Sequence, residues 1–172
     1  IFEDSKGGNV ETAISAYQNI AALSKVNAVL TWGSGIGIAL TPLMNKDKVV
    51  QIGVATANPK YATPNDFSFR IFPDSKVEGA FDAKFVFNEL NIKEAVVIFT
   101  QNDYGIGGKD AFVETFSSLG GKVLSVQPVD AGAADVRTQL LKLRNENPKI
   151  IFASVYPKEG ISLLQQAKEC RR

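Results

Sequence analysis

The sequence predicts an α/β protein built from two doubly wound lobes with parallel sheets. Apolar runs of strand length alternate with segments of helical spacing along the chain, which is typical of parallel strands covered by helices. This alternation is interrupted near Phe72-Pro73. We therefore expect an N-terminal lobe over residues 1–73 and a C-terminal lobe over residues 74–172.

The first lobe is expected to alternate short strands with helices. Asn9 is placed to cap a helix whose apolar residues recur at helical spacing from Val10 to Ala21. A second helix follows a glycine-rich turn and covers residues 34–44. The expected strands cover residues 28–31, 49–54 and 67–72, with a strand end at Phe2 and a loop over residues 56–66.

The second lobe repeats this pattern. A helix capped by Asp74 or Ser75 is expected to run to about Leu90. Gly120-Gly121 ends a helix over residues 107–119, as glycine at a helix C-terminus commonly does. The remaining strands are expected over residues 95–100, 122–127 and 150–155, with helices through Val136, Leu140 and Leu143 to about residue 147 and over residues 161–167.

Composition excludes several classes of function. The 172 residues include 19 Lys+Arg and 18 Asp+Glu, so the net charge of +1 gives no broad attraction to nucleic acid or anionic membranes. The chain has no His, which rules out Ser-His-Asp and Cys-His catalysis within it. Its one cysteine, Cys170, can form no internal disulfide, and we expect no metal site and no cofactor.

Candidate ligand residues stand at the ends of predicted strands, where parallel sheets bind ligands. The first place is the turn over residues 31–37, where Ser34 and the amides of a helix start favour a small carboxylate. A dinucleotide fingerprint is incomplete there, because Ile38 replaces its third glycine and no acidic residue follows about twenty positions on. A tight turn without a ligand remains an alternative.

Three further strand ends carry polar or aromatic residues. The Ala55 backbone and the Thr56 hydroxyl follow the strand over residues 49–54 and can hydrogen-bond a ligand. Tyr104 and Tyr156 each follow a strand and precede a helix, and each offers a flat apolar face and a hydroxyl. The alternative at both places is a helix start exposed to solvent, where the tyrosine has no role in ligand binding.

These four places, in this order, resemble the periplasmic substrate-binding proteins of branched-chain amino-acid ABC transporters, the Leu/Ile/Val-binding, type I family. The similarity runs along nearly the whole chain. The motifs that carry it are Phe2-Glu3-Asp4, Gly33-Ser34-Gly35 with Pro42 beyond it, Val54-Ala55-Thr56-Ala57, Phe69-Arg70-Ile71-Phe72-Pro73-Asp74, Asp103-Tyr104-Gly105-Ile106-Gly107, and Tyr156-Pro157 with Glu159.

The resemblance implies a non-enzymatic protein that captures an amino acid or similar small acid between two hinged lobes. Ser34, Ala55 and Thr56 match the positions that hold the ligand α-carboxylate and ammonium. Tyr104 and Tyr156 match residues of the second lobe that close over the ligand. Trp32 is expected to line the side-chain pocket. The implied partner is an ABC permease, and the implied location is the periplasm or the extracellular cell surface.

The resemblance also implies that the sequence is the central portion of such a protein. The family has a strand and helix before the position of Ile1, and further strands with an acidic ligand residue beyond that of Arg172. Both lobes are therefore expected to be incomplete, and the strand end at Phe2 is expected to lack its neighbour.

Two other functions remain open. The rings of Trp32 and Tyr104 can stack on an aromatic ligand, so a binding protein or sensor domain for an aromatic acid, an amide or a urea-like ligand is the main alternative. A nucleotide-dependent α/β enzyme using residues 33–37 is disfavoured by the incomplete fingerprint.

Overall fold

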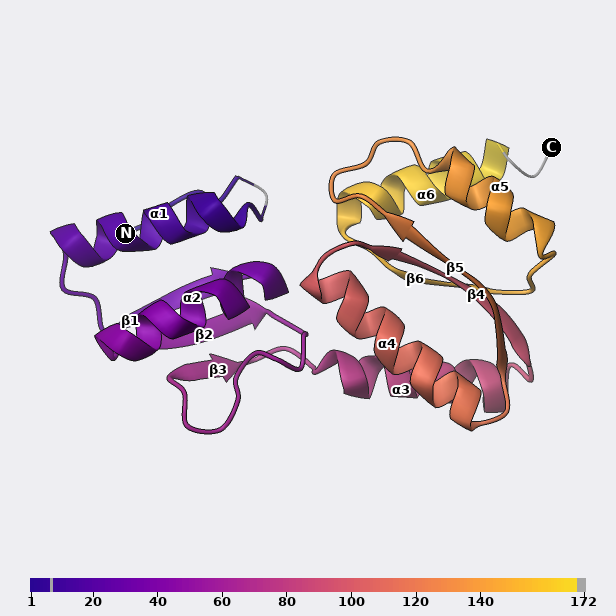
Figure 1. The fold of residues 1–172 in the computed structure, drawn as a ribbon, viewed down its shortest axis with the longest axis horizontal. Coiled ribbons are helices and arrows are strands. Elements are labelled where there is room, and N and C mark those ends of the chain that lie inside the picture. Colours follow the sequence, from indigo (N-terminus) through magenta and orange to yellow (C-terminus); the bar gives the residue numbers. More distant parts are fainter. Residues whose placement is uncertain (7, 170–172) are drawn as a thin grey trace. The chain divides into compact units, whose positions relative to one another are not determined.

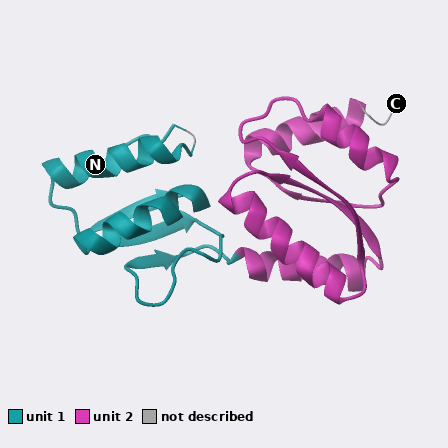
Figure 2. Ribbon diagram, viewed as in Figure 1, with its two compact units in different colours: residues 1–74 teal, residues 75–172 magenta. Residues whose placement is uncertain are grey.

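The computed structural model describes residues 1–6 and 8–169, so Cys170 lies outside the described residues. The chain forms two compact units, unit 1 over Ile1–Asp74 and unit 2 over Ser75–Arg172 (Figure 2). Each unit has its own parallel three-stranded sheet, which confirms the predicted fold class.

The described residues of unit 1 form two helices and three strands, whose arrangement is shown in Figure 1. The strands lie in the order β1-β2-β3, all parallel, and one row of paired residues runs Leu30–Ile52–Phe69. The elements are α1 (Val10–Leu23), β1 (Ala28–Trp32), α2 (Ser34–Asp47), β2 (Val50–Ala55) and β3 (Ser68–Arg70).

The helices of unit 1 form where the sequence supplies caps and an apolar face. Asn9 caps α1 as predicted, since its side-chain oxygen accepts a hydrogen bond from the Thr12 amide at 2.8 Å. Both helices pack into one cluster at the sheet, which buries Ala13, Tyr17, Ile36, Leu40, Met44 and Val49.

The two faces of the unit 1 sheet differ in character. The strand residues beneath the helices include Thr31, Gln51 and Ser68, which are buried and polar. Residues of the opposite face include Leu30 and Phe69, whose side chains are 70% and 58% exposed. Side chains alternate between faces along a strand, so this split follows directly from the sequence of each strand.

Unit 2 contains the order β5-β4-β6, with β4 in the centre and all strands parallel. Helices cover both faces of this sheet, with α3 and α4 on one side and α5 and α6 on the other (Figure 1). The elements are α3 (Ser75–Lys84), η1 (Phe85–Glu89), β4 (Glu94–Thr100), α4 (Asp103–Ser118), β5 (Lys122–Val129), α5 (Arg137–Asn145), β6 (Ile151–Ser154) and α6 (Pro157–Glu169).

Strand β4 divides the core of unit 2 into two apolar layers. Ala95 and Val97 contribute to a cluster with Phe112 and Phe116 of α4. Val96 and Ile98 face the other way, into a cluster completed by Val129, Val136, Leu140, Leu143 and Leu163. All four β4 residues are fully buried, as expected for the central strand of a sheet covered on both faces.

The helix that opens unit 2 ends in a π-helical turn. The Leu90 amide donates to the Phe85 carbonyl at 3.0 Å, a bond that spans five residues. Within this turn Val86 is buried, and Phe87 packs edge-on against Phe116 with ring centroids 5.9 Å apart. The predicted helix end near Leu90 is therefore correct, but its last turn is wider than an α-helical one.

Several element boundaries differ from the prediction. Helices α4 and α6 begin at Asp103 and Pro157, four residues earlier than expected in each case. Strand β3 is shorter than residues 67–72 at both ends. At its start, the Phe67 amide donates to the Asn45 side chain at 2.8 Å instead of to a strand. The strand end expected at Phe2 is absent from the described residues, and Phe2 is exposed.

Candidate functional site

Helix α2 starts directly at the carboxyl end of β1. Gly33 takes a backbone φ of 89° at the N-cap, a conformation that favours glycine, and it provides no side-chain cap. Helices α1 and α4, by contrast, are capped by the side chains of Asn9 and Asn102. The first amides of α2 thus lie at the positive end of the helix dipole without a cap from the side chain of the N-cap residue.

Ser34 and Thr56 tie two strand-end loops together in unit 1. The Asn58 amide donates to Ser34 Oγ at 3.2 Å, and Thr56 Oγ1 donates to the Gly33 carbonyl at 3.4 Å. Both side chains are fully buried. Each hydroxyl therefore has an internal structural partner, which the sequence analysis did not foresee. A hydroxyl that accepts one hydrogen bond still has an O–H hydrogen to donate.

Trp32 and Ala55 complete the unit 1 group. They are paired across β1 and β2, at a shift in the register of the two strands. The Trp32 side chain is 47% exposed, so a large aromatic surface lies at this end of the sheet. The structure thus brings together all four residues that the sequence analysis selected in this unit.

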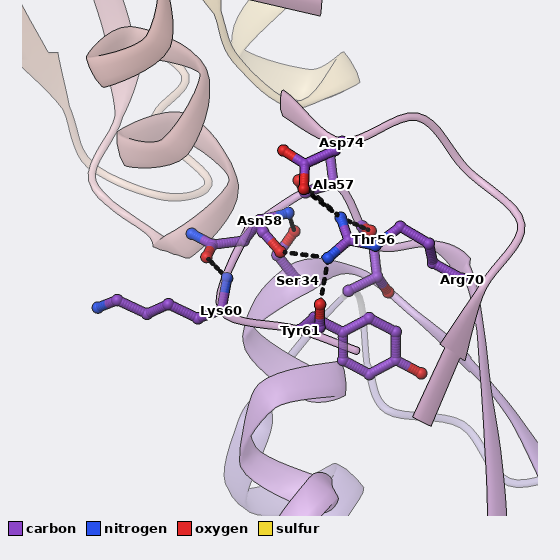
Figure 3. A network of polar contacts seen from close by, with 8 residues as sticks. All are labelled: Ser34, Thr56, Ala57, Asn58, Lys60, Tyr61, Arg70 and Asp74. Atoms are coloured by element: carbon purple, nitrogen blue, oxygen red, sulfur yellow. Dashed lines mark hydrogen bonds and ion pairs between the residues drawn. The ribbon is translucent and has the colours of Figure 1, made fainter. Parts of the chain in front are cut away.

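Arg70, at the end of β3, organises the loop that contains Thr56 (Figure 3). Its Nη1 donates to the carbonyls of Ala57 at 3.2 Å and Thr56 at 3.5 Å. Its Nη2 donates to the carbonyl of Asn58 at 3.2 Å and to that of Tyr61. A single guanidinium therefore satisfies a cluster of loop carbonyls that no strand or helix pairs.

Tyr104 and Tyr156 meet in unit 2. Tyr104 lies in the first turn of α4 and Tyr156 directly before α6, and their rings stack with centroids 5.1 Å apart and an interplanar angle of 17°. Gly105 allows α4 to start this close to β4, because a Cβ at that position would overlap the Thr100 carbonyl oxygen. The two predicted tyrosines of this unit thus form one aromatic group.

The Tyr104 hydroxyl is held in its protonated form. Burial raises the pKa of this phenol, and the negative charges of Glu78 and Asp82 raise the pKa further. Since an unperturbed tyrosine already ionises only near pH 10, Tyr104 remains a hydrogen-bond donor at neutral pH.

Two buried polar side chains of α6 hold the loop after β5. Glu159 is 2% exposed and accepts a hydrogen bond from the Gly132 amide. Gln166 accepts from the Val136 amide and donates to the Ala134 carbonyl, each at 2.8 Å. These contacts give Glu159 a structural role at a strand end.

Asn58 and Arg70, which position the loops of unit 1, were not predicted from the sequence as site residues. One feature of the sequence pointed to Arg70, since it is the only charged residue in the apolar stretch of residues 67–72.

Among the described residues, no group of three or more His, Cys, Asp or Glu side chains is arranged to hold a metal ion. No helix in the described ranges is long and apolar enough to cross a membrane.

The two parallel sheets are packed against helices, and hydroxyls and aromatic rings follow their strands. These features define an α/β protein with candidate ligand residues in both units. A family model described as periplasmic binding protein matches residues 1–170, so the chain belongs to the periplasmic binding protein family.

Solved structures support this assignment. The leucine binding protein LivK from Thermotoga maritima is 26% identical, with a TM-score of 0.86 over 96% of this chain and 47% of that chain. LivJ from Streptococcus pneumoniae, solved in complex with isoleucine, is 23% identical, with a TM-score of 0.88 over 99% of this chain and 48% of that chain.

A third similar structure has a different ligand. It is a solute binding protein of an ABC transporter from Rhodopseudomonas palustris in complex with 3,4-dihydroxy benzoic acid, 17% identical, with a TM-score of 0.84 over 99% of this chain and 47% of that chain. The chain thus spans about half the length of these structures. Comparison with curated proteins gave no match. The type I periplasmic binding protein fold is confirmed, while the ligands named for its relatives vary.

Proposed function

We propose that this chain carries ligand-binding residues of an extracytoplasmic solute-binding protein, which delivers a small amino acid or related carboxylate to an ABC permease. The observation that carries the proposal is the pair of loops at the uncapped start of α2, where the Ser34 and Thr56 hydroxyls lie within one hydrogen-bonded group. The proposed location is the periplasm or the extracellular cell surface, and no catalytic step is proposed.

Unit 1 supplies the groups that bind the polar end of the ligand. A carboxylate at the N-terminus of α2 accepts hydrogen bonds from the helix amides, with the Ala55 backbone and Thr56 beside it. The Ser34 hydroxyl, which is buried in the ligand-free chain, becomes accessible on binding and donates its O–H hydrogen to the carboxylate. Hydrogen bonds to a charged group contribute roughly 1.5–3 kcal/mol each. The carboxylate therefore supplies much of the binding free energy in this proposal.

Unit 2 supplies an aromatic group, and this observation favours a second candidate ligand. The stacked rings of Tyr104 and Tyr156 can pack on an aliphatic side chain, as in a branched-chain amino acid. They can equally extend their stack onto an aromatic acid. Relatives with isoleucine and with 3,4-dihydroxy benzoic acid support both candidates.

Binding of defined ligands tests the proposal. Native mass spectrometry of the purified protein would first detect any retained small molecule, and titration calorimetry would follow with L-isoleucine and 3,4-dihydroxybenzoate. We expect Ser34→Ala to weaken binding of the preferred ligand by about tenfold to a hundredfold, since one hydrogen bond to a charged group is lost. Ser15→Ala is the matched control, because the Ser15 hydroxyl bonds only its own helix backbone at Glu11 and is exposed.

The same titrations separate the two ligand classes. Preference for 3,4-dihydroxybenzoate would select the aromatic acid, and preference for L-isoleucine would select the branched-chain amino acid. Equal affinities of Ser34→Ala and the unchanged protein for the preferred ligand would contradict the proposed role of the α2 N-terminus.

A further inference from the structure

Arg70 contacts both the candidate ligand loop of unit 1 and the segment by which the chain leaves that unit. We propose that Arg70 is a positioning residue, which holds the ligand loop (residues 56–61) in its binding shape and couples it to the exit segment (residues 71–74). This inference rests on the proposed function, since it assigns the ligand loop a part in binding.

The contacts of the guanidinium show how the loop is held. Its two terminal nitrogens donate to the carbonyls of Thr56, Ala57, Asn58 and Tyr61, so four carbonyls of one turn converge on a single cation (Figure 3). The loop forms no helix or strand, so its carbonyls have no regular backbone partners. The Asn58 carbonyl also accepts from the Tyr61 amide at 3.1 Å, and Arg70 holds it together with the other three. The Arg70 side chain is only 17% exposed, which limits the competition from water.

The ligand loop, held by Arg70, is also hydrogen-bonded to the candidate ligand residue Ser34. The Asn58 carbonyl accepts from Arg70, and the Asn58 amide donates to Ser34 Oγ at 3.2 Å. At the other end of the loop, the one O–H hydrogen of Tyr61 is shared between the carbonyls of Gln51 and Phe69, each 3.3 Å from the hydroxyl oxygen. The position of the Ser34 hydroxyl thus depends on a loop that Arg70 fixes between two strands.

The same guanidinium also contacts the exit segment. Arg70 Nη1 lies 3.4 Å from Asp74 Oδ2, and Asp74 is the last residue of unit 1. Nη1 is therefore shared between the ligand loop and the carboxylate of the exit segment. A change in the loop that moves the guanidinium changes its contact with Asp74, so loop and exit segment respond to one another through this side chain.

Arginine suits this position for a geometric reason. Its planar fork presents several N–H donors in fixed directions, whereas the lysine ammonium is a compact point charge at the end of a flexible chain. Lysine would preserve the positive charge near Asp74 but could not donate hydrogen bonds to the four loop carbonyls in the same geometry. The substitution Arg70→Lys therefore separates the geometry of the fork from its charge.

The experiment measures hydrogen exchange of the ligand-free full chain, together with the affinity for L-isoleucine and 3,4-dihydroxybenzoate. We expect Arg70→Lys to accelerate amide exchange at least about tenfold in residues 56–61 and 71–74, and to leave the amides of α1 and α2 unchanged. Binding of the preferred probe should weaken by about tenfold or more, because the loop no longer holds its binding shape.

Two further variants sharpen the result. Asp74→Asn removes only the charge of the exit segment, so we expect faster exchange in residues 71–74, with little change in residues 56–61. Arg137→Lys is the control, because Arg137 pairs with Asp135 and Glu169 at an exposed site of unit 2. It should change neither exchange in unit 1 nor ligand affinity.

Each outcome decides the proposal. Unchanged exchange of residues 56–61 in Arg70→Lys would overturn it, as would faster exchange throughout unit 1 or an unaltered affinity in a protein that binds a probe. If the unchanged protein binds neither probe, the proposed function fails for these ligands. The exchange result then decides the positioning role alone: acceleration confined to the two segments supports it, and its absence overturns it.

Discussion

The two units build parallel sheets of three strands each, and the polarity of the residues on the sheet faces differs between them. In unit 2, helices cover both faces of the sheet, and the central strand β4 is buried among apolar side chains. In unit 1, helices α1 and α2 cover one face, and the strand residues beneath them include Thr31, Gln51 and Ser68. Apolar residues such as Leu30 and Phe69 are exposed on the other face.

This difference affects how each unit holds its candidate ligand residues. Unit 2 presents Tyr104 and Tyr156 from helix starts that a packed apolar core fixes. Unit 1 holds Ser34 and Thr56 by hydrogen bonds in a polar group. Hydrogen bonds constrain direction more strongly than apolar contacts do, and a ligand carboxylate requires directed donors. The polar interior of unit 1 therefore matches its proposed role.

The largest effect is expected in the apolar core of unit 2. Phe112 is fully buried and stacks on Phe116 and Phe152, with centroids 5.2 and 4.1 Å away. Phe112→Ala should lower the free energy of unfolding of unit 2 by about 3–5 kcal/mol, because it removes buried surface and leaves a cavity. Denaturant titration followed by circular dichroism measures this loss.

The single tryptophan, Trp32, lies in unit 1 and reports on that unit separately. Its fluorescence transition should stay in place in Phe112→Ala. Phe69→Ala is the matched control, since Phe69 is 58% exposed and its loss should change stability by no more than about 0.5 kcal/mol. Equal losses in the two variants would mean that the packing of unit 2 does not differ from the open face of unit 1.

A smaller effect is expected in the polar interior of unit 1. The Gln51 amide donates to Thr31 Oγ1 at 3.3 Å and to the Gly37 carbonyl at 3.0 Å, while its carbonyl oxygen accepts from Thr41 at 3.1 Å. Gln51→Leu removes these three hydrogen bonds, which should cost about 1–3 kcal/mol. Part of the loss is limited because Thr41 still donates to the Gly37 carbonyl at 2.9 Å.

The Trp32 transition in denaturant measures the effect of Gln51→Leu. The control is Gln127→Leu in unit 2, where the side chain is half-buried and its amide bonds Ser125 on the same strand. A Gln51→Leu protein that is as stable as the original would show that the polar face is not needed for the stability of unit 1.

Tyr17→Phe should have a modest effect that depends on pH. Burial, followed by the hydrogen bond and the charge of Asp47, raises the pKa of Tyr17 to about 12. Below the unfolded pKa of about 10 the stabilisation is complete, and it is lost between about pH 10 and 12, where only the unfolded chain releases the proton. The variant should lose about 0.5–1.5 kcal/mol at neutral pH with the hydrogen bond to Asp47.

Unfolding of unit 1, followed by Trp32 fluorescence from pH 8 to 12, tests this expectation. The decline in stability at alkaline pH should be shallower in Tyr17→Phe than in the unchanged protein. Part of the decline remains in both, because burial also raises the pKa of Tyr61 in the same unit. Parallel curves would contradict the assignment of the raised pKa to Tyr17.

The smallest effect is expected on the open face of unit 1. Leu30 is 70% exposed, so Leu30→Thr should change the free energy of unfolding by no more than about 0.5 kcal/mol. Val97→Thr in the fully buried strand β4 is the matched comparison, and it should be distinctly less stable because it buries a hydroxyl. A large loss in Leu30→Thr would show that this face is covered in solution.

Most of the fold could be predicted because each element carries a local signal. The strands of unit 2 are apolar runs, and the Asn9 cap begins α1 where expected. The early starts of α4 and α6 were also readable, since Asn102 is a favourable cap and Pro157 a favourable first helical residue. The start of β3 could not be predicted, because the Phe67 amide before it is bound by Asn45, far away in the sequence.

The places of the candidate ligand residues in the fold could be predicted, but the hydrogen bonds between them could not. Strand ends and helix starts locate Ser34, Thr56, Tyr104 and Tyr156 from local patterns. The bonds that hold the loops of unit 1 join side chains to backbone carbonyls, and every residue type has such a carbonyl. The sequence therefore contains no pattern that would identify Arg70 as the partner of residues 56–61.

The π-helical turn at Phe85–Glu89 has a consequence for changes in chain length. Such a turn closes over one more residue than an α-helical turn, so loss of one residue there restores a regular helix without removing an element. The same deletion within α4 would shift Gly105 and Gly108 away from their close approaches to Thr100 and Ser154. Single-residue deletions in this protein should accordingly be tolerated at the end of the first helix of unit 2 and rejected in the next.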